Sequence, residues 1–275
     1  MSVGAHRISD EQLLSRLEAA RAVARAAGQL TLEFFQKDTL QVERKADDSP
    51  VTQADRLAEQ LMREQIARRF PEDAIVGEEF GECPGSSAFS WVLDPIDGTK
   101  SFISGVPLYS VLVGVVHQAR SVLGVVHIPG LDECVFAAEG HGAWHVRGQG
   151  EPRRTRVAPG LALRDGLFVT SQVDSFAQRG AAEVYAQLEQ AAYITRTWGD
   201  GYGYLLVATG RAVAMVDAAM NLWDAAAIQP VIVEAGGRFS DWGGEPTIYG
   251  GDGIAANAAA AEEVLAITRP YCRRA

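Results

Sequence analysis

Residues 108–146 constrain the fold of this chain most strongly, because they read as four consecutive antiparallel strands. Apolar and β-branched runs occupy 109–117, 121–127, 133–138 and 142–146. Turn signals such as Pro129-Gly130 and Gly140 separate these runs. The segment therefore predicts a β-meander, and together with the helical patterns around it a layered α/β architecture with a mixed sheet.

Helical and extended patterns lie on both sides of the meander. Apolar spacing predicts helices over 10–35, with Ser9 as N-cap, and over 53–70, with Thr52 as N-cap and Pro71 after its end. Strands are predicted at 74–77, 91–94, 167–170, 212–216, 238–240 and 253–256, and further helices at 176–192, 202–209, 223–235 and 259–268. The 275 residues are expected to form a single domain with two packed lobes, about 1–158 and about 159–275.

The charge balance argues against two classes of partner. The chain has 25 lysines and arginines against 35 aspartates and glutamates, a formal net charge of −10. Nucleic acids and anionic membrane surfaces attract basic faces, so neither is an expected partner. The three widely spaced cysteines indicate neither a zinc site nor a disulfide framework, and the N-terminus lacks an apolar signal-peptide core. We therefore expect a cytoplasmic protein.

The sharpest local motif is Asp94-Pro95-Ile96-Asp97-Gly98-Thr99, which directly follows an apolar strand. Sites in α/β folds usually open where strands end. Two aspartates three residues apart, on a turn that contains proline, can converge on a hard cation such as Mg²⁺ or Mn²⁺. A simple strand-end turn explains the hexapeptide equally well, since Asp-Gly is a common turn dipeptide. The spacing is one residue longer than the Asp-x-Asp motif of aspartyl-phosphate phosphatases, so we expect no covalent intermediate.

Three other segments place acidic residues beside structural signals. Glu78 and Glu79 follow the strand at 74–77, Asp55 lies in the first turn of the helix after Thr52, and Asp224 begins the helix over 223–235. Each has a simpler explanation when taken alone. Glu78 can belong to a solvated loop, and Asp55 and Asp224 can act as helix caps. Their combination with the hexapeptide favours a shared site.

Together these segments resemble the inositol monophosphatase family of metal-dependent, lithium-sensitive phosphatases. The matching pieces stand in the family's order and span nearly the whole chain after the first helix. They are Lys45 with Ser49-Pro-Val-Thr-Gln-Ala-Asp55, Gly77-Glu-Glu79, Trp91-Val-Leu-Asp-Pro-Ile-Asp-Gly-Thr99, Leu206-Val-Ala-Thr-Gly210 and Trp223-Asp-Ala-Ala226. The resemblance implies a layered αβαβα sugar-phosphatase-like fold with mixed sheets, commonly a homodimer. It also implies two or three Mg²⁺ ions per subunit, with Mn²⁺ as a possible substitute.

The resemblance also implies roles for individual residues. The metal ligands would be the carboxylates of Glu78, Asp94, Asp97 and Asp224 and the backbone carbonyl of Ile96. Asp55 and Thr99 match the family's pair that orients the attacking water, and Glu78 joins them in the catalytic set. Water would attack phosphorus in line, and the amides around Gly98 and Thr99 would hold the phosphate. Residues 1–158 would then form the metal-site lobe and residues 159–275 the substrate lobe.

Within the family, the chain looks most like the histidinol-phosphate phosphatases of histidine biosynthesis. That likeness lies in 97–108, in Trp198-Gly-Asp-Gly-Tyr-Gly-Tyr204 and in 214–224. Histidinol phosphate carries an amine and an imidazole beside its phosphate. Asp200 and Asp217 could hold the cationic amine or ring, and Asn221 could hydrogen-bond the imidazole. Lys100 could meet the phosphate or pair with a ligand carboxylate. A turn for Asp200, a strand end for Asp217 and a surface position for Lys100 are the simpler explanations.

Two other functions stay open at this point. The shared metal site does not select a leaving group, so an inositol-1-phosphate or broad sugar-phosphate phosphatase is the alternative within the same class. A non-catalytic regulatory protein on the same fold is the alternative from a different class, and the complete acidic set argues against it. The five histidines, including His117, His127 and His145, are interpreted as structural, and Lys45 has no assigned role.

Overall fold

The computed structural model describes residues 8–37, 40–44 and 50–272. Lys45 and Ser49, which contribute to the first matching segment, lie outside the described residues. The described residues form an eight-stranded sheet, a five-stranded sheet and a two-stranded antiparallel pair of β1 (Val42–Arg44) with β2 (Pro50–Thr52). The predicted lobe boundary near residue 158 falls between the last strand of the first sheet and the first strand of the second.

The first sheet has eight strands in the order β10-β9-β8-β7-β6-β5-β3-β4. All neighbouring strands are antiparallel except β3 and β5, which run parallel. Because β5 and β3 run in the same direction, the turn after β3 and the hexapeptide at the end of β5 lie together at the carboxyl ends of these two strands. The strands are β3 (Ala74–Gly77), β4 (Gly81–Cys83), β5 (Phe89–Asp97), β6 (Ser110–His117), β7 (Arg120–Ile128), β8 (Glu133–Ala138), β9 (Gly142–Arg147) and β10 (Arg153–Arg154).

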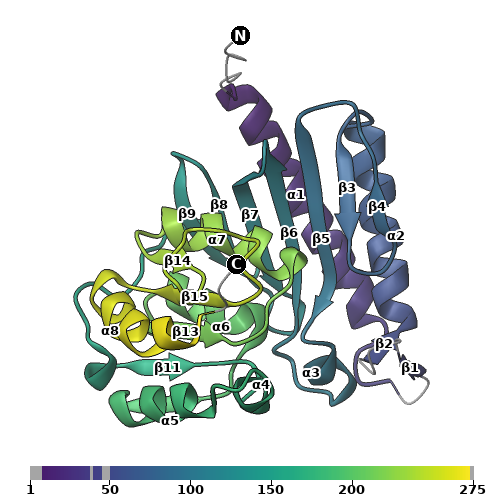
Figure 1. The fold of residues 1–275 in the computed structure, drawn as a ribbon. Helices are drawn as coiled ribbons and strands as arrows, with labels where there is room; N and C mark the ends of the chain where they lie inside the picture. Colours follow the sequence, from purple (N-terminus) through teal and green to yellow (C-terminus); the bar gives the residue numbers. More distant parts are fainter. Residues whose placement is uncertain (1–7, 38–39, 45–49, 273–275) are drawn as a thin grey trace.

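Helices cover both faces of the first sheet (Figure 1). On one face, α1 (Asp10–Leu32) and α2 (Gln53–Arg69) pack against alternate side chains of the strands, such as Trp91 and Leu93. Capping boxes begin both helices, at Ser9 with Gln12 and at Thr52 with Asp55. On the other face, α6 (Asp200–Ala208) and α7 (Leu222–Glu234) pack against the remaining side chains.

Helix α7 lies unusually close to the first sheet, and two glycines allow this approach. Gly114 of β6 and Gly124 of β7 are register partners under the helix. A Cβ atom at Gly124 would lie 1.8 Å from the carbonyl oxygen of Ala227, and one at Gly114 would lie 2.7 Å from the carbonyl carbon of Ala226. The close packing brings the first turn of α7, and therefore Asp224, next to the end of β5.

The second sheet lies on the opposite side of α6 and α7. Its five strands follow the order β12-β11-β13-β15-β14, in which β11 is parallel to β12 and β13 and the other pairs are antiparallel. Helices α5 (Ala182–Ala191) and α8 (Ala258–Thr268) cover its outer face. The strands are β11 (Leu167–Val169), β12 (Ile194–Arg196), β13 (Ala214–Asp217), β14 (Arg238–Ser240) and β15 (Gly253–Ala256). The layers therefore follow the order helix, sheet, helix, sheet, helix, which confirms the predicted αβαβα fold.

The element predictions fail at a few identifiable places. The helix expected over 176–192 is two helices, α4 (Asp174–Gln178) and α5, because Gly180 adopts a left-handed φ of 79° between them. The short elements β1, β4, β10, β12 and α3 (Thr99–Ile103) have too few residues to show a periodic pattern, and the sequence did not predict them. The basic stretch at Arg153-Arg154 forms the exposed edge strand β10.

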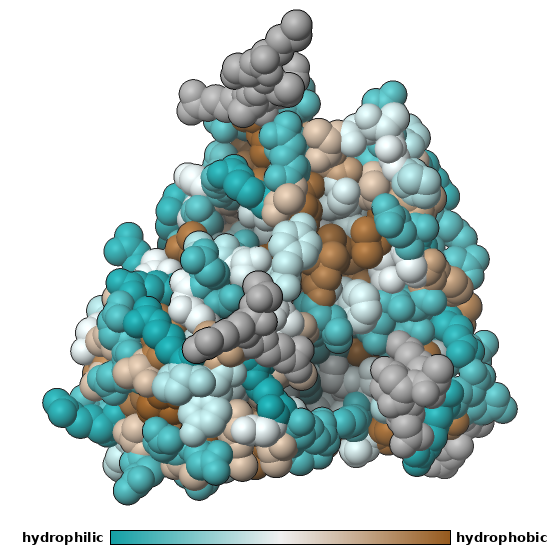
Figure 2. All heavy atoms as spheres, in the orientation of Figure 1, coloured by the Kyte–Doolittle hydropathy of each residue, from teal (hydrophilic) through white to brown (hydrophobic). Residues whose placement is uncertain are grey.

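The surface agrees with the polar composition of the chain. Figure 2 shows hydrophilic side chains over most of one face of the molecule, with smaller hydrophobic areas between them. Among the described residues, no helix combines the length and apolar character that crossing a membrane requires.

Candidate active site

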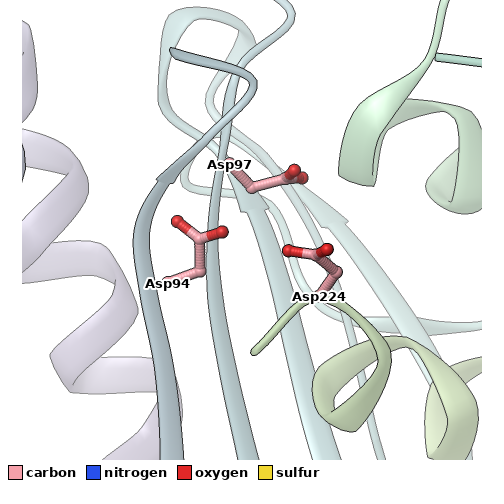
Figure 3. A group of neighbouring side chains, drawn as sticks. All are labelled: Asp94, Asp97 and Asp224. Carbon is pink, nitrogen blue, oxygen red and sulfur yellow. The ribbon is translucent and has the colours of Figure 1, made fainter. Parts of the chain in front are cut away.

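Three aspartates from different parts of the chain converge at the end of β5. Asp94 lies near the end of this strand, Asp97 is its last residue, and Asp224 occupies the first turn of α7. Figure 3 shows their carboxylates facing a common space. One oxygen of each carboxylate lies within 4.8 Å of the corresponding oxygens of the other two. The structure thus brings together three of the four predicted carboxylate ligands.

The electrostatics of the three aspartates are those of crowded like charges. Burial, reinforced by the nearby charges of Glu78, Asp97 and Asp224, raises the pKa of Asp94 well above its ordinary value. Burial and the charges of Asp200 and Asp224 do the same to the pKa of Asp97. Burial, with Glu78 as a contributing charge, raises the pKa of Asp224 to about 7. A bound cation would relieve this repulsion, and an all-oxygen donor set suits a hard divalent cation.

Hydrogen bonds orient each of these carboxylates. The amide of Ile96 donates to Asp94 Oδ1 at 3.0 Å, and the amide of Asn221 donates to Asp224 Oδ2 at 2.7 Å. Asp97 Oδ2 accepts from Ser110 Oγ and from the amide of Gly201, both at 2.5 Å. Since Gly201 lies in α6 and Ser110 begins β6, the carboxylate of Asp97 connects the two halves of the chain.

Glu78 lies beside this group without belonging to the three mutually close carboxylates. It follows β3, and its amide donates to the carbonyl of Leu93 at 3.2 Å, which holds its backbone against β5. Its charge contributes to the raised pKa values of both Asp94 and Asp224. The prediction that Glu78 completes the ligand set is therefore consistent with its position.

The pair predicted to orient water is held by local hydrogen bonds. Asp55 Oδ2 accepts from the amide of Thr52 at 2.8 Å and from its hydroxyl at 2.6 Å. Burial raises the pKa of Asp55 to about 6. The Thr99 hydroxyl donates to the carbonyl of Ile96 at 3.1 Å, so the oxygen expected to be a metal ligand already accepts one hydrogen bond. A carbonyl oxygen has a second lone pair, which leaves room for a cation.

A cavity of about 400 Å³ opens beside the three aspartates. Its charged lining residues are Asp97, Asp200, Asp217, Asp224 and Lys100, so acids outnumber bases. Asn221, which begins α7, also lines it, and so do Gln172, Ser175 and Gln178, which the sequence did not single out. An acidic cavity of this kind would repel a phosphate ester unless bound cations reversed its local charge.

Two acids of the cavity come from the second half of the chain and differ in their surroundings. Asp200 begins α6 in a left-handed conformation with φ of 53°, and its amide donates to Ser171 Oγ at 2.9 Å. Burial, with Asp217 as a nearby charge, raises the pKa of Asp200 to about 6. Asp217 is buried and accepts hydrogen bonds from Thr170, Ser171 and Tyr204.

Lys100 lines the cavity and contacts another lining residue, Gln172. Lys100 lies in α3, next to Gly98 and Thr99, and its Nζ donates to the side chain of Gln172 in the segment between β11 and α4. Its predicted contact with phosphate therefore competes with a contact that joins the two halves of the chain. Gln172 and Ser171 carried no signal in the sequence, because each acts through partners that only the folded chain brings near. Tyr204 lies in a segment that the sequence did single out, but its contact with Asp217 was not predicted.

Comparisons with known proteins agree with this geometry. The profile of the Inositol monophosphatase family matches residues 12–272. A histidinol-phosphatase of Chlorobaculum parvum is 40% identical over 251 residues, which cover 91% of this chain and 95% of that protein. A histidinol-phosphatase of Streptomyces coelicolor is 34% identical over 256 residues, which cover 92% and 96%. The structure of an inositol monophosphatase from Zymomonas mobilis matches with a TM-score of 0.79 at 32% identity, covering 95% of this chain and 99% of that one.

Proposed function

The chain belongs to the inositol monophosphatase family and is a phosphatase of small phosphorylated substrates, and we propose that it hydrolyses L-histidinol phosphate in histidine biosynthesis. The products would be L-histidinol and inorganic phosphate. The observation that carries this proposal is the acidic cavity, in which Asp200 and Asp217 lie beside the three converging aspartates. Negative charge beyond the cation site favours a substrate that is cationic next to its phosphate. The similarity to two histidinol-phosphatases supports the same choice.

The proposal includes Mg²⁺, with Mn²⁺ as a substitute. Asp94, Asp97 and Asp224 would hold two or three ions together with Glu78 and the carbonyl of Ile96. The buried, mutually repelling carboxylates fit this role, because their oxygens are the donors that hard cations prefer. When bound, the ions would lower the pKa of water and shield the charge of the phosphate.

The residues around the ions would position the reactants. Asp55, with a pKa of about 6, is ionised at neutral pH and can accept a proton from the attacking water. Thr99 would orient that water opposite the leaving oxygen for in-line attack. The amides of Gly98 and Thr99 and the side chain of Lys100 would hold the phosphate.

The leaving group would lie in the second half of the cavity. Asp200 would pair with the amine or the imidazole, and Asn221 would hydrogen-bond the ring. The acceptor capacity of Asp217 is taken up by its hydrogen bonds, so we propose that it acts on a cationic substrate through its charge and through its hold on Ser171.

The decisive experiment compares two substrates under identical conditions. Phosphate release from L-histidinol phosphate and from inositol 1-phosphate is measured with Mg²⁺ and after chelation by EDTA. We expect kcat/KM to be at least about tenfold higher for L-histidinol phosphate, since a site with paired polar partners discriminates strongly against an analogue that lacks the matching groups. Chelation should abolish both activities.

The same measurement decides among the alternatives. Faster turnover of inositol 1-phosphate would favour an inositol or broad sugar-phosphate phosphatase, which the structural match to the Zymomonas mobilis enzyme supports as the second candidate. Release of no phosphate from either ester would contradict the proposed activity and restore the non-catalytic alternative. The predicted homodimer can be tested separately by analytical ultracentrifugation.

A further inference from the structure

A buried glutamate in α2 anchors the segment that carries Glu78. The side chain of Glu59 has 0% relative exposure. Its Oε2 accepts from the amide of Glu79 at 2.7 Å, and its Oε1 accepts from the amide of Phe80 at 3.2 Å and from Arg63 Nε at 2.7 Å. A buried carboxylate needs such partners to offset its desolvation. Two of the three partners are backbone amides of the turn between β3 and β4.

These contacts fix the backbone on both sides of Glu78. On one side, the amide of Glu78 itself donates to Leu93, the residue before Asp94. On the other side, the amides of the next two residues donate to Glu59. Arg63, the ion-pair partner of Glu59, donates in turn to the carbonyl of Gly81. The turn is therefore tied to β5 and to α2 at once.

Gly77 shows how closely the carboxylate of Glu59 fits against this turn. A Cβ atom at Gly77 would lie 2.0 Å from Glu59 Oε1 and 2.8 Å from Arg63 Nη2. The Glu59 carboxylate thus occupies the space that any side chain at position 77 would need. The glycine of the Gly77-Glu78-Glu79 segment is required by this close approach.

Helix α2 also carries Asp55, four residues before Glu59, and both side chains are buried. Residues four apart lie on the same face of a helix. One face of α2 therefore presents the proposed water-orienting carboxylate and, one turn later, the carboxylate that holds the Glu78 turn.

We propose that Glu59 is a positioning residue for metal binding, which holds the turn after β3 so that the carboxylate of Glu78 faces Asp94 and Asp224. This inference rests on the proposed role of Glu78 as a metal ligand. Glu59 contacts no substrate or ion in this role. It acts through the backbone of residues 79 and 80, in the way that outer-shell partners orient the direct ligands of a metal.

The test measures metal affinity without substrate. Mn²⁺ is titrated into the metal-free protein, and free Mn²⁺ is followed by electron paramagnetic resonance. Glu59→Gln keeps the size of the side chain but replaces one acceptor oxygen with a donor, so one of the two amides loses its partner. We expect Mn²⁺ to bind at least about tenfold more weakly, as is typical for loss of an outer-shell partner. Glu64→Gln, an exposed position of the same helix, should leave the affinity unchanged.

A double-mutant cycle separates positioning from general destabilisation. If Glu59 acts through Glu78, Glu59→Gln should cause no further loss of Mn²⁺ affinity in a Glu78→Gln background. An unchanged affinity of the Glu59→Gln protein, or an equal loss in both backgrounds, would overturn the inference. An unchanged affinity of the Glu78→Gln protein would instead contradict the proposed ligand role of Glu78.

Circular dichroism of the metal-free protein will show whether the Glu59→Gln protein folds. If it does not fold, a second variant tests the same inference. Arg63→Met removes the ion pair to Glu59 and the hydrogen bond to Gly81, at a side chain that remains partly exposed. It should weaken Mn²⁺ binding by a smaller factor, again with no additional loss in the Glu78→Gln background. Unchanged Mn²⁺ affinity in this folded variant would overturn the inference.

Discussion

Two buried acids of the candidate active site, Asp94 and Asp217, differ in what surrounds their carboxylate oxygens. Around Asp94 the dominant neighbours are other carboxylates, and its amide partner is the residue two positions along the same turn. Around Asp217, donors converge from three residues: Thr170 Oγ1 at 3.3 Å, the amide and hydroxyl of Ser171 at 2.9 and 3.0 Å, and the Tyr204 hydroxyl at 2.9 Å. A carboxylate has about four lone-pair sites, and these donors use that capacity.

The difference distinguishes a carboxylate whose oxygens are available to a ligand from a carboxylate whose oxygens are hydrogen-bonded within the fold. Burial raises the pKa of both residues. At Asp217, the donors partly offset this effect within the protein itself. At Asp94, neighbouring charges add to it, and protonation or a bound cation would relieve the repulsion. The surroundings of Asp94 therefore fit the proposed cation site, and those of Asp217 fit a supporting role.

Phosphatase activity should distinguish Asp94 from Asp217 most strongly. Asp94→Asn removes charge where the cations would bind, so kcat should fall by about two to three orders of magnitude. Asp217→Asn should change mainly KM for L-histidinol phosphate. Both are measured as phosphate release at saturating Mg²⁺, with the exposed Asp165→Asn as the matched control. Activity of Asp94→Asn close to that of the unaltered protein would refute the ligand assignment.

In the metal-free protein, substitution of aspartate by asparagine should change the thermal stability in opposite directions at positions 94 and 217. Asp94→Asn relieves repulsion and should raise the midpoint of thermal unfolding in EDTA. Asp217→Asn places an amide donor against the hydroxyls and the amide that now donate to Asp217. It should lower the free energy of unfolding by about 1–3 kcal/mol, which corresponds to roughly 2–4 °C for each kcal/mol.

Differential scanning calorimetry in EDTA measures both shifts directly. Equal destabilisation by the two substitutions would mean that the acids play the same structural role, and the comparison would fail. Stabilisation by Asp94→Asn that disappears when Mg²⁺ is added would support the comparison, because the bound cation would relieve the same repulsion that the substitution relieves.

The sequence predicted the acids better than it predicted their partners. The hexapeptide that ends β5 and the cap at Asp224 both follow from local signals, and the structure brings Asp94, Asp97 and Asp224 together. The layered fold also follows, since long apolar strands and amphipathic helices leave strong periodic patterns.

The partners depend on tertiary contacts that leave no local pattern. Ser110 and Glu59 are ordinary residues of a strand and a helix until the folded chain places an aspartate or a turn beside them. The break in the helix expected over 176–192 was visible only as Gly180, a weak signal within an otherwise helical pattern. The structure was therefore needed to identify which acids are fully hydrogen-bonded.

The stability of the metal-free protein should also depend on pH, and the sign of this dependence follows from the raised pKa values. Asp224, at about 7, and Asp55 and Asp200, at about 6, titrate above the ordinary value of 3.8. Between these limits the three carboxyl groups bind more protons in the folded protein than in the unfolded chain. Burial lowers the pKa of His127 to about 4, which makes a smaller contribution of opposite sign. The free energy of unfolding in EDTA should therefore fall as pH rises from about 5 to 7.5, by on the order of 1 kcal/mol per pH unit for each group within its own range.

Urea unfolding at several pH values, with and without Mg²⁺, measures this slope. The lower limit near pH 5 is chosen because the pKa of Glu133 is lowered by its contacts with His145 and Arg211, so its opposite contribution is lost only at more acid pH. Mg²⁺ should stabilise the protein more at pH 7.5 than at pH 5, since ligand carboxylates must lose their protons to bind it. Asp94→Asn should flatten the slope in EDTA, whereas Asp217→Asn should leave most of it. A free energy of unfolding in EDTA that rises with pH would mean that Asp94, Asp97 and Asp224 ionise without repelling one another. The physical reason for a cation among these three carboxylates would then be absent.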